Sequence, residues 1–246
     1  SVSMGGINKV YSLSFLDPYW SDDGVSRGIN AYYRDIDTSD LNTGDYKEKN
    51  YGAGVNFGIP LAEFEKFTVG SMFEYVELNL QSTSPPDYIS FCNRISNSSS
   101  NSCDTNNLVF YANWMHNTVN NPFFPTEGHN LDLTFDISTP GLDLEYFKIT
   151  ATAEKFFPLS ESVTTKLAAS VGYADAYGDN PYPFFKNFRV GGKSSVRGFQ
   201  EGSIGKKVLN PTTGSYTTSG GKQMLYFNAE TYFPIPFVKK SDSYRL

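Results

Sequence analysis

One seven-residue stretch decides the fold class: Leu131-Asp132-Leu133-Thr134-Phe135-Asp136-Ile137. Its odd positions are all apolar and its even positions are all polar, which is the period-two pattern of a β-strand with one apolar face. The same alternation recurs at residues 51–59, 147–154, 163–172 and 225–233. No stretch of comparable length repeats at the helical period of 3.6 residues, so we expect an all-β protein with little helix.

The alternation predicts ten strands. They lie near residues 1–5, 10–17, 25–35, 49–59, 67–80, 107–117, 129–138, 145–157, 162–175 and 222–233. Most are longer than the roughly five residues of a globular strand, and they match the length that a tilted strand needs to cross a bilayer. The alternative is a soluble β-sandwich with uneven loops, and the strand lengths favour a transmembrane antiparallel β-barrel.

The composition agrees with a membrane barrel. The chain has 17 Tyr and 20 Phe among 246 residues, yet its mean hydropathy is −0.38. A barrel strand presents only every second side chain to lipid, so its mean hydropathy stays low while aromatic girdles line the two interfaces. No apolar stretch approaches the 18 to 20 residues of a membrane-spanning helix.

The connections between strands alternate in length. Short turns near residues 17–24, 59–61, 122–128, 157–160 and 233–236 alternate with polar loops at 35–50, 81–106, 139–145 and 176–222. Bacterial outer-membrane barrels have short periplasmic turns and long exterior loops. We therefore expect an integral outer-membrane protein whose longer loops, 81–106 and 176–222 above all, face the exterior.

Several function classes are excluded by composition. The net charge of −6 gives no basic surface for nucleic acid. Catalytic motifs of the Gly-x-Ser-x-Gly, His-Glu-x-x-His and phosphate-loop kinds are absent from the sequence. The only two histidines, His116 and His129, flank a short turn and are expected to be polar residues at the membrane interface. We expect no enzyme activity, no cofactor and no metal.

The two cysteines lie in the Ser- and Asn-rich loop at 81–106, whose composition is not expected to build a core of its own. Cys92 and Cys103 are eleven positions apart, and no histidine is near them to complete a zinc site. A disulfide within this loop is therefore predicted, and it requires an oxidising compartment.

The loop at 176–222 carries an unusual glycine-rich run. Gly191 and Gly192 permit tight reversals and act as a hinge, and they are followed by Val196-Arg197-Gly198-Phe199. A loop of this kind can fold back into a barrel, with residues 196–199 inside the barrel outline, Phe199 packed on the wall and Arg197 paired with a wall carboxylate. The alternative is a solvated exterior loop in which Arg197 has no partner, and the residues alone leave both open.

Val196-Arg197-Gly198-Phe199 resembles the sixth-loop motif of the BamA family, whose relatives include TamA and the two-partner secretion transporters. The likeness extends along nearly the whole chain. It includes Asp17-Pro18-Tyr19-Trp20 with Asp23-Gly24, Phe124-Pro125-Thr126-Glu127-Gly128, and Pro183-Phe184-Phe185-Lys186-Asn187-Phe188. Residues 176–222 are called the sixth loop below.

The resemblance implies a sixteen-stranded barrel, of which residues 1–246 form a domain incomplete at both ends, roughly from strand three to strand twelve. Periplasmic POTRA domains, the lateral gate and the acidic partners of Arg197 are then expected outside this chain. The implied function is the folding of client β-barrel proteins into the outer membrane without nucleotide hydrolysis. The implied partners are those clients, accessory lipoproteins and outer-membrane lipid.

Two other functions remain open at this point. A two-partner secretion pore, which passes one unfolded exoprotein, shares the sixth-loop motif. A passive porin is allowed by the lumen-facing glycines at positions 52, 54 and 58, although a porin needs no arginine-tipped inward loop.

Overall fold

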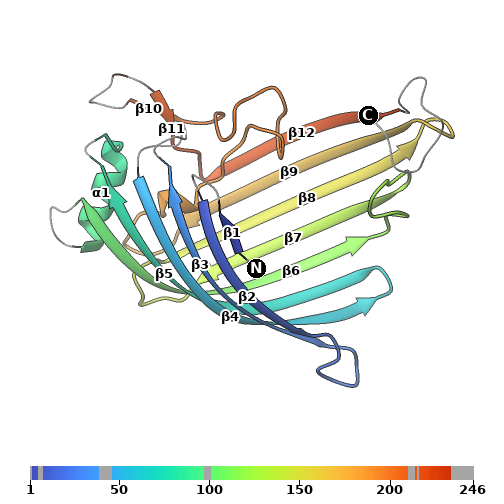
Figure 1. Ribbon diagram of the computed structural model, residues 1–246, viewed down its shortest axis with the longest axis horizontal. Helices are drawn as coiled ribbons and strands as arrows, with labels where there is room; N and C mark the ends of the chain where they lie inside the picture. Colours follow the sequence, from blue (N-terminus) through green and yellow to red (C-terminus); the bar gives the residue numbers. More distant parts are fainter. Residues whose placement is uncertain are drawn as a thin grey trace.

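A computed structural model gives the structure of residues 2–4, 8–38, 46–81, 83–96, 101–209, 214 and 216–233. Within these residues, ten strands form one antiparallel sheet that curves into a trough (Figure 1). Their order in the sheet follows the chain: β1 (Val2–Met4), β2 (Asn8–Asp17), β3 (Ser26–Asp37), β4 (Tyr46–Ala62), β5 (Glu65–Leu80), β6 (Ser102–Asn117), β7 (Gly128–Ser138), β8 (Tyr146–Pro158), β9 (Thr164–Ala176) and β12 (Gln223–Tyr232). The ten predicted strands and the all-β fold class are confirmed.

The two ends of the strands differ as predicted, although the short turn expected at 59–61 lies instead at Glu63 and Phe64, because β4 continues to Ala62. Glu63 and Phe64 alone join β4 to β5, and residues 159–163 join β8 to β9, whereas the sixth loop joins β9 to β12 at the opposite end. Four predicted connections extend beyond the described residues. The positions concerned are 39–45 of the loop at 35–50, 82 and 97–100 of the loop at 81–106, 210–213 and 215 of the loop at 176–222, and 234–236 of the turn at 233–236.

The cross-strand register shows which side chains share a face. Leu133 lies opposite Ala151, Ala151 opposite Val171, and Val171 opposite Leu225, and directly opposite residues of a sheet point to the same side. Leu133 is 41% exposed, and the members of this face on β7 and β8 that were predicted to face outward are exposed or half-buried: Leu131, Leu133, Phe135, Ile137, Phe147 and Ile149. The apolar face is therefore the convex outer face.

The concave face carries the alternate positions. Glu48 and Asn50 on β4 and Glu74 on β5 are buried there although they are polar. Gly52 also faces inward, and a Cβ atom at this position would lie 2.2 Å from the ring of Tyr32. This glycine is therefore required by packing of the Tyr32 ring and does not open a pore.

The loop at 81–106 is not the structureless excursion that its composition suggested. It contains helix α1 (Pro86–Ser96), and β6 begins at Ser102. Tyr88, Phe91 and Cys92 of α1 are at most 3% exposed, so this segment contributes to a core after all. The sixth loop likewise contains a 3-10 turn, η1 (Phe184–Lys186), and a hairpin of β10 (Lys207–Leu209) and β11 (Tyr216–Thr218).

Sequence signals for α1 are present. Pro86 occupies the first helical position, Asp87 lies in the first turn and Arg94 in the last, an arrangement that favours a helix. Tyr88, Phe91 and Ile95 are spaced at i, i+3 and i+7, which places them on one helical face. Among the described residues, no helix is long and apolar enough to span a membrane.

The assignment of the two faces can be tested by placing one charge on each. We expect Leu133→Arg to destabilise the protein by about 2–4 kcal/mol, because arginine on the lipid face must enter hydrocarbon. Thr134→Arg is the matched control, since Thr134 is the next residue and faces the polar interior. Urea unfolding of the full-length protein in lipid vesicles measures both. Equal losses of free energy would contradict the assignment.

Candidate functional site

The sixth loop lies on the concave face of the sheet. Lys148 of β8 donates a 3.1 Å hydrogen bond to the Lys186 carbonyl, and its ammonium lies 4.4 Å from the centre of the Phe188 ring. The Phe188 ring covers Gly172 of β9, where a Cβ atom would be 2.5 Å from the ring. Only a glycine at position 172 therefore allows the loop to approach the wall this closely.

One nearly buried ion pair ties the base of the loop to the wall. The Lys186 ammonium is 2.6 Å from a Glu74 carboxylate oxygen, and the two side chains are 21% and 12% exposed. The Tyr32 hydroxyl donates to the other oxygen of Glu74 at 3.2 Å. Burial lowers the pKa of Lys186, but the Glu74 carboxylate outweighs burial, so the pKa is raised and the ammonium remains charged. The pair joins η1 to β5 and β3.

Helix α1 also contacts η1 and holds it in place. The Phe184 ring stacks on Tyr88 with the ring centres 3.7 Å apart and the planes 10° from parallel. Phe91 and Tyr46 meet Phe184 edge-on at 5.5 and 5.3 Å. Edge-to-face and offset stacked rings each add about 0.5–1.5 kcal/mol beyond the area that they bury. Phe184 is therefore clamped between the helix and β4.

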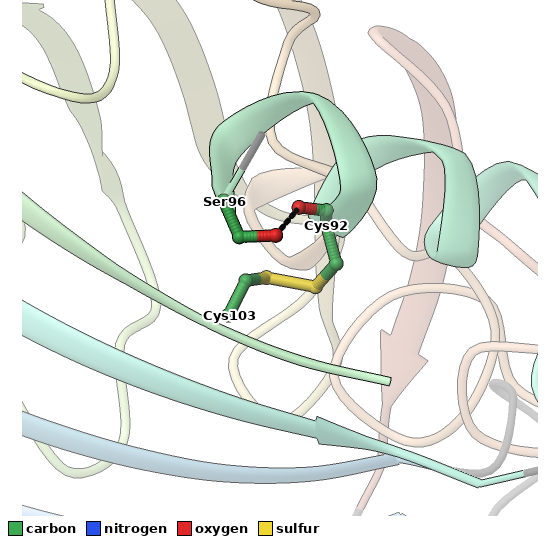
Figure 2. Close-up of a disulfide and its surroundings, with 3 residues drawn as sticks. All are labelled: Cys92, Ser96 and Cys103. Carbon is green, nitrogen blue, oxygen red and sulfur yellow. Dashed lines mark hydrogen bonds between the residues drawn. A yellow bond between two sulfur atoms is a disulfide. The ribbon is translucent and has the colours of Figure 1, made fainter. Parts of the chain in front are cut away.

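A disulfide fixes α1 on the sheet. Cys92 of α1 is bonded to Cys103 of β6, and their Cα atoms are 5.2 Å apart (Figure 2). Ser96 donates a 2.8 Å hydrogen bond to the Cys92 carbonyl in the last turn of the helix. The predicted disulfide is confirmed, although it joins a helix to a strand rather than two points within a loop. Its position makes α1 a rigid support for Phe184.

Residues 191–199 form the tip of the sixth loop, and its glycines allow the chain to fold back on itself. Gly191, Gly192 and Gly198 have φ angles of 117°, 91° and 86°, values that residues with a side chain rarely adopt. The Gly191 N–H donates to the Ser195 hydroxyl at 2.8 Å, and the Gly192 N–H donates to the Phe199 carbonyl at 3.1 Å. The tip is thus a small self-contained fold.

This tip rests on the inward face of β12. Asn228 donates a 2.5 Å hydrogen bond to the Ser195 carbonyl. Arg197 Nη2 lies 3.4 Å from the carboxylate of Glu230, which also accepts a 2.5 Å hydrogen bond from Tyr232. The resemblance placed the acidic partner of Arg197 beyond this chain, but β12 pairs directly with β9 and brings Glu230 beneath the tip.

One expectation about the tip is wrong and one is met in part. Phe199 does not pack on the wall: the residue is 56% exposed, and its contact in the tip is made by its carbonyl, which accepts from Gly192. Arg197 does pair with a wall carboxylate, that of Glu230, but its side chain is 69% exposed, so the pair contributes at most about 1 kcal/mol. Val196 is half-buried between the two contacts of the tip with β12. Among the described residues, no group of histidine, cysteine or carboxylate side chains is placed to hold a metal ion.

Comparison with known proteins then fixes the family. Residues 1–246 match the Omp85 superfamily domain. The chain belongs to the Omp85 superfamily. It is 32% identical over 240 residues to the outer membrane protein assembly factor BamA of Neisseria meningitidis serogroup B, covering 96% of this chain and 30% of that protein. It is also 27% identical over 138 residues to a SAM50-like protein of Schizosaccharomyces pombe, covering 54% of this chain and 28% of that protein.

The fold agrees with the family. The crystal structure of BamA from Haemophilus ducreyi lacking POTRA domains 1–3 superposes with a TM-score of 0.88 at 26% identity, covering 97% of this chain and 47% of that chain. This Omp85 domain is accordingly an integral β-barrel segment of the outer membrane. It spans less than half the length of each of these relatives.

The contributions of the two ion pairs to the free energy of unfolding should differ, and this difference can be measured. We expect Lys186→Met to cost about 3–5 kcal/mol of unfolding free energy, because it leaves the buried Glu74 carboxylate without its cationic partner. Arg197→Met should cost at most about 1 kcal/mol, because its pair is exposed. A double-mutant cycle with Glu74→Gln isolates the coupling between Lys186 and Glu74. A coupling near zero would show that the pair does not hold the loop.

The disulfide should act on the sixth loop through α1. We expect the double substitution Cys92→Ser and Cys103→Ser to lower stability by about 2–4 kcal/mol. It should also speed protease cleavage within the sixth loop, because Phe184 loses its fixed support. Limited proteolysis of the full-length protein, with and without reductant, measures this. Cleavage of the sixth loop at the wild-type rate in the double variant would show that α1 does not help to hold the loop on the wall.

Proposed function

We propose that the protein containing this chain folds client β-barrel proteins into the outer membrane, and that it does so as a non-enzymatic assembly factor. The observation that carries the proposal is the 32% identity, across 96% of the chain, to a protein named an outer membrane protein assembly factor. The fold match to a second BamA supports it. These named relatives favour assembly over a two-partner secretion pore.

The physical task of such a factor is to pair client backbone groups before they meet hydrocarbon, where each unpaired group costs several kcal/mol. A strand edge offers those pairs by β-augmentation. We infer that the ten strands are part of the wall of a larger barrel, incomplete at both ends of residues 1–246. In support, β1 and β12 stand at opposite edges of the described sheet and do not pair with each other.

We assign the sixth loop the role of an inward brace, with Gly191 and Gly192 as its hinge and residues 196–199 within its tip. The base is anchored on β5 through Lys186 and Glu74, and the tip reaches β12 through Arg197 and Glu230. It therefore spans the concave side between strands far apart in the sheet, which argues against an open porin. With the loops at 81–106 and 176–222 on the exterior side, the partners are client barrels, accessory lipoproteins and outer-membrane lipid.

Reconstitution tests the function directly. The full-length protein is placed in phospholipid vesicles, and a urea-unfolded outer-membrane barrel is added as client. Client folding is followed by its heat-modifiable gel mobility. We expect wild-type vesicles to fold the client faster than empty vesicles and Lys186→Met to be slower than wild type. Lys207→Gln, an exposed charge on β10, should match wild type.

The outcomes separate the two parts of the proposal. If wild-type vesicles fold the client no faster than empty vesicles, the assembly function is contradicted. If wild type is active and Lys186→Met is equally fast, assembly stands and the role of the sixth loop as a brace is contradicted.

A further inference from the structure

The outer face of the sheet is hollowed over β7, β8, β9 and β12. Two hollows of about 380 and 370 Å³ share Leu131, Ala153 and Ala169, so they form one continuous groove. Ala153 lies opposite both Leu131 and Ala169 in the register, which puts all three on the lipid-facing side. A hollow here opens toward hydrocarbon rather than toward the barrel interior.

Large side chains wall the groove on both sides. Trp114 and Leu133 stand on the β6 and β7 side, and Leu225 and Phe227 stand on the β12 side. Leu225 and Phe227, on the edge strand of the described sheet, are 79% and 62% exposed and form the outer wall of the groove on this side. The short Ala153 side chain lies between these walls and makes the floor. The shape and the apolar lining suit an acyl chain.

The end of the groove nearest the short turns is polar and cationic. Lys155 lies opposite His129 in the register, and both line the groove. Among the described residues, Lys155 pairs with no carboxylate, and its ammonium lies only over the Phe157 ring at 5.8 Å. His129 is fixed by a 3.0 Å hydrogen bond between its Nδ1 and the Thr118 hydroxyl. The Lys155 ammonium is unusual because it lies on a lipid-facing surface with no anion beside it among the described residues.

The depth of this cationic end matches a lipid headgroup. Lys155 is three residues from the end of β8 at Pro158, where the chain enters the short turn to β9. The Phe157 ring, 39% exposed, and the Trp114 ring, half-buried, also lie on the outer face near this end, as aromatic residues do at membrane interfaces. His116 stacks on His129 at 5.0 Å, and its Nδ1 is hydrogen-bonded to Glu65 at 3.0 Å, so this nitrogen is already engaged.

We propose that this groove is a binding site for an anionic phospholipid of the leaflet on the short-turn side. One acyl chain lies over Ala153 and Ala169, and the phosphate accepts hydrogen bonds from Lys155 and His129. A zwitterionic lipid fills the same groove, but its own cation opposes Lys155, so an anionic headgroup is preferred. The site goes beyond the assembly function, because it concerns the wall that faces lipid.

The probe is phosphatidylglycerol. The full-length protein is placed in nanodiscs of equal phosphatidylglycerol and phosphatidylcholine, and the lipids retained after mild extraction are counted by native mass spectrometry. We expect about fivefold enrichment of phosphatidylglycerol over its bulk share, the ratio that corresponds to the ~1 kcal/mol which one lysine gains near anionic lipid. Lys155→Gln should bring the ratio close to one while lipid is still retained.

Two further variants separate the chain from the headgroup. Ala153→Phe fills the groove and should remove the retained lipid altogether, whereas Ala112→Phe, an outward alanine of β6 beside the groove, should leave it in place. Lys207→Gln controls for loss of charge alone. The proposal is overturned if wild type shows no enrichment, if Lys155→Gln keeps the enrichment, or if Ala153→Phe retains as much lipid as wild type.

Discussion

The constraint on which this structure depends is that no backbone N–H or C=O group can remain unpaired in hydrocarbon. The sheet meets it with long, nearly continuous ladders: β5 pairs with β6 from Glu65 to Asn79 without a register shift. A fixed register in turn fixes which side chains meet lipid, because a slip of one residue would exchange the two faces. Phe73 therefore lies outside, and its neighbour Glu74 is free to lie inside and bind Lys186.

The polar interior that this alternation creates is covered by the sixth loop, and the loop is held mainly at its base. The Lys186 and Glu74 pair is short and nearly buried, whereas the Arg197 and Glu230 pair is longer and largely exposed. Phe184, clamped by Tyr88 of α1, adds an apolar anchor beside the first pair. The glycine-rich motif is thus the weakly attached end of the sixth loop. Most of the interactions that hold the loop on the wall are made by η1.

The strands were predictable because alternation along one strand is a local property that the lipid environment imposes directly. The sequence of helix α1 contains local helix signals at Pro86, Asp87 and Arg94. The helix was not predicted because the Ser- and Asn-rich composition of the surrounding loop indicated an irregular segment. The pairing of Lys186 with Glu74 could not be predicted, since 112 residues separate the partners and only the curvature of the sheet brings them together. The same holds for Glu230, whose role depends on β12 returning to pair with β9.

Hydrogen exchange tests the central claim that the base of the sixth loop holds it on the wall. The measurement compares amide exchange of residues 183–205 in the full-length protein in nanodiscs between wild type, Lys186→Met and Arg197→Met. The account predicts protection of the Phe188, Gly192 and Ile204 amides in wild type, its loss in Lys186→Met and its retention in Arg197→Met. Fast exchange in wild type, or loss of protection only in Arg197→Met, would contradict it.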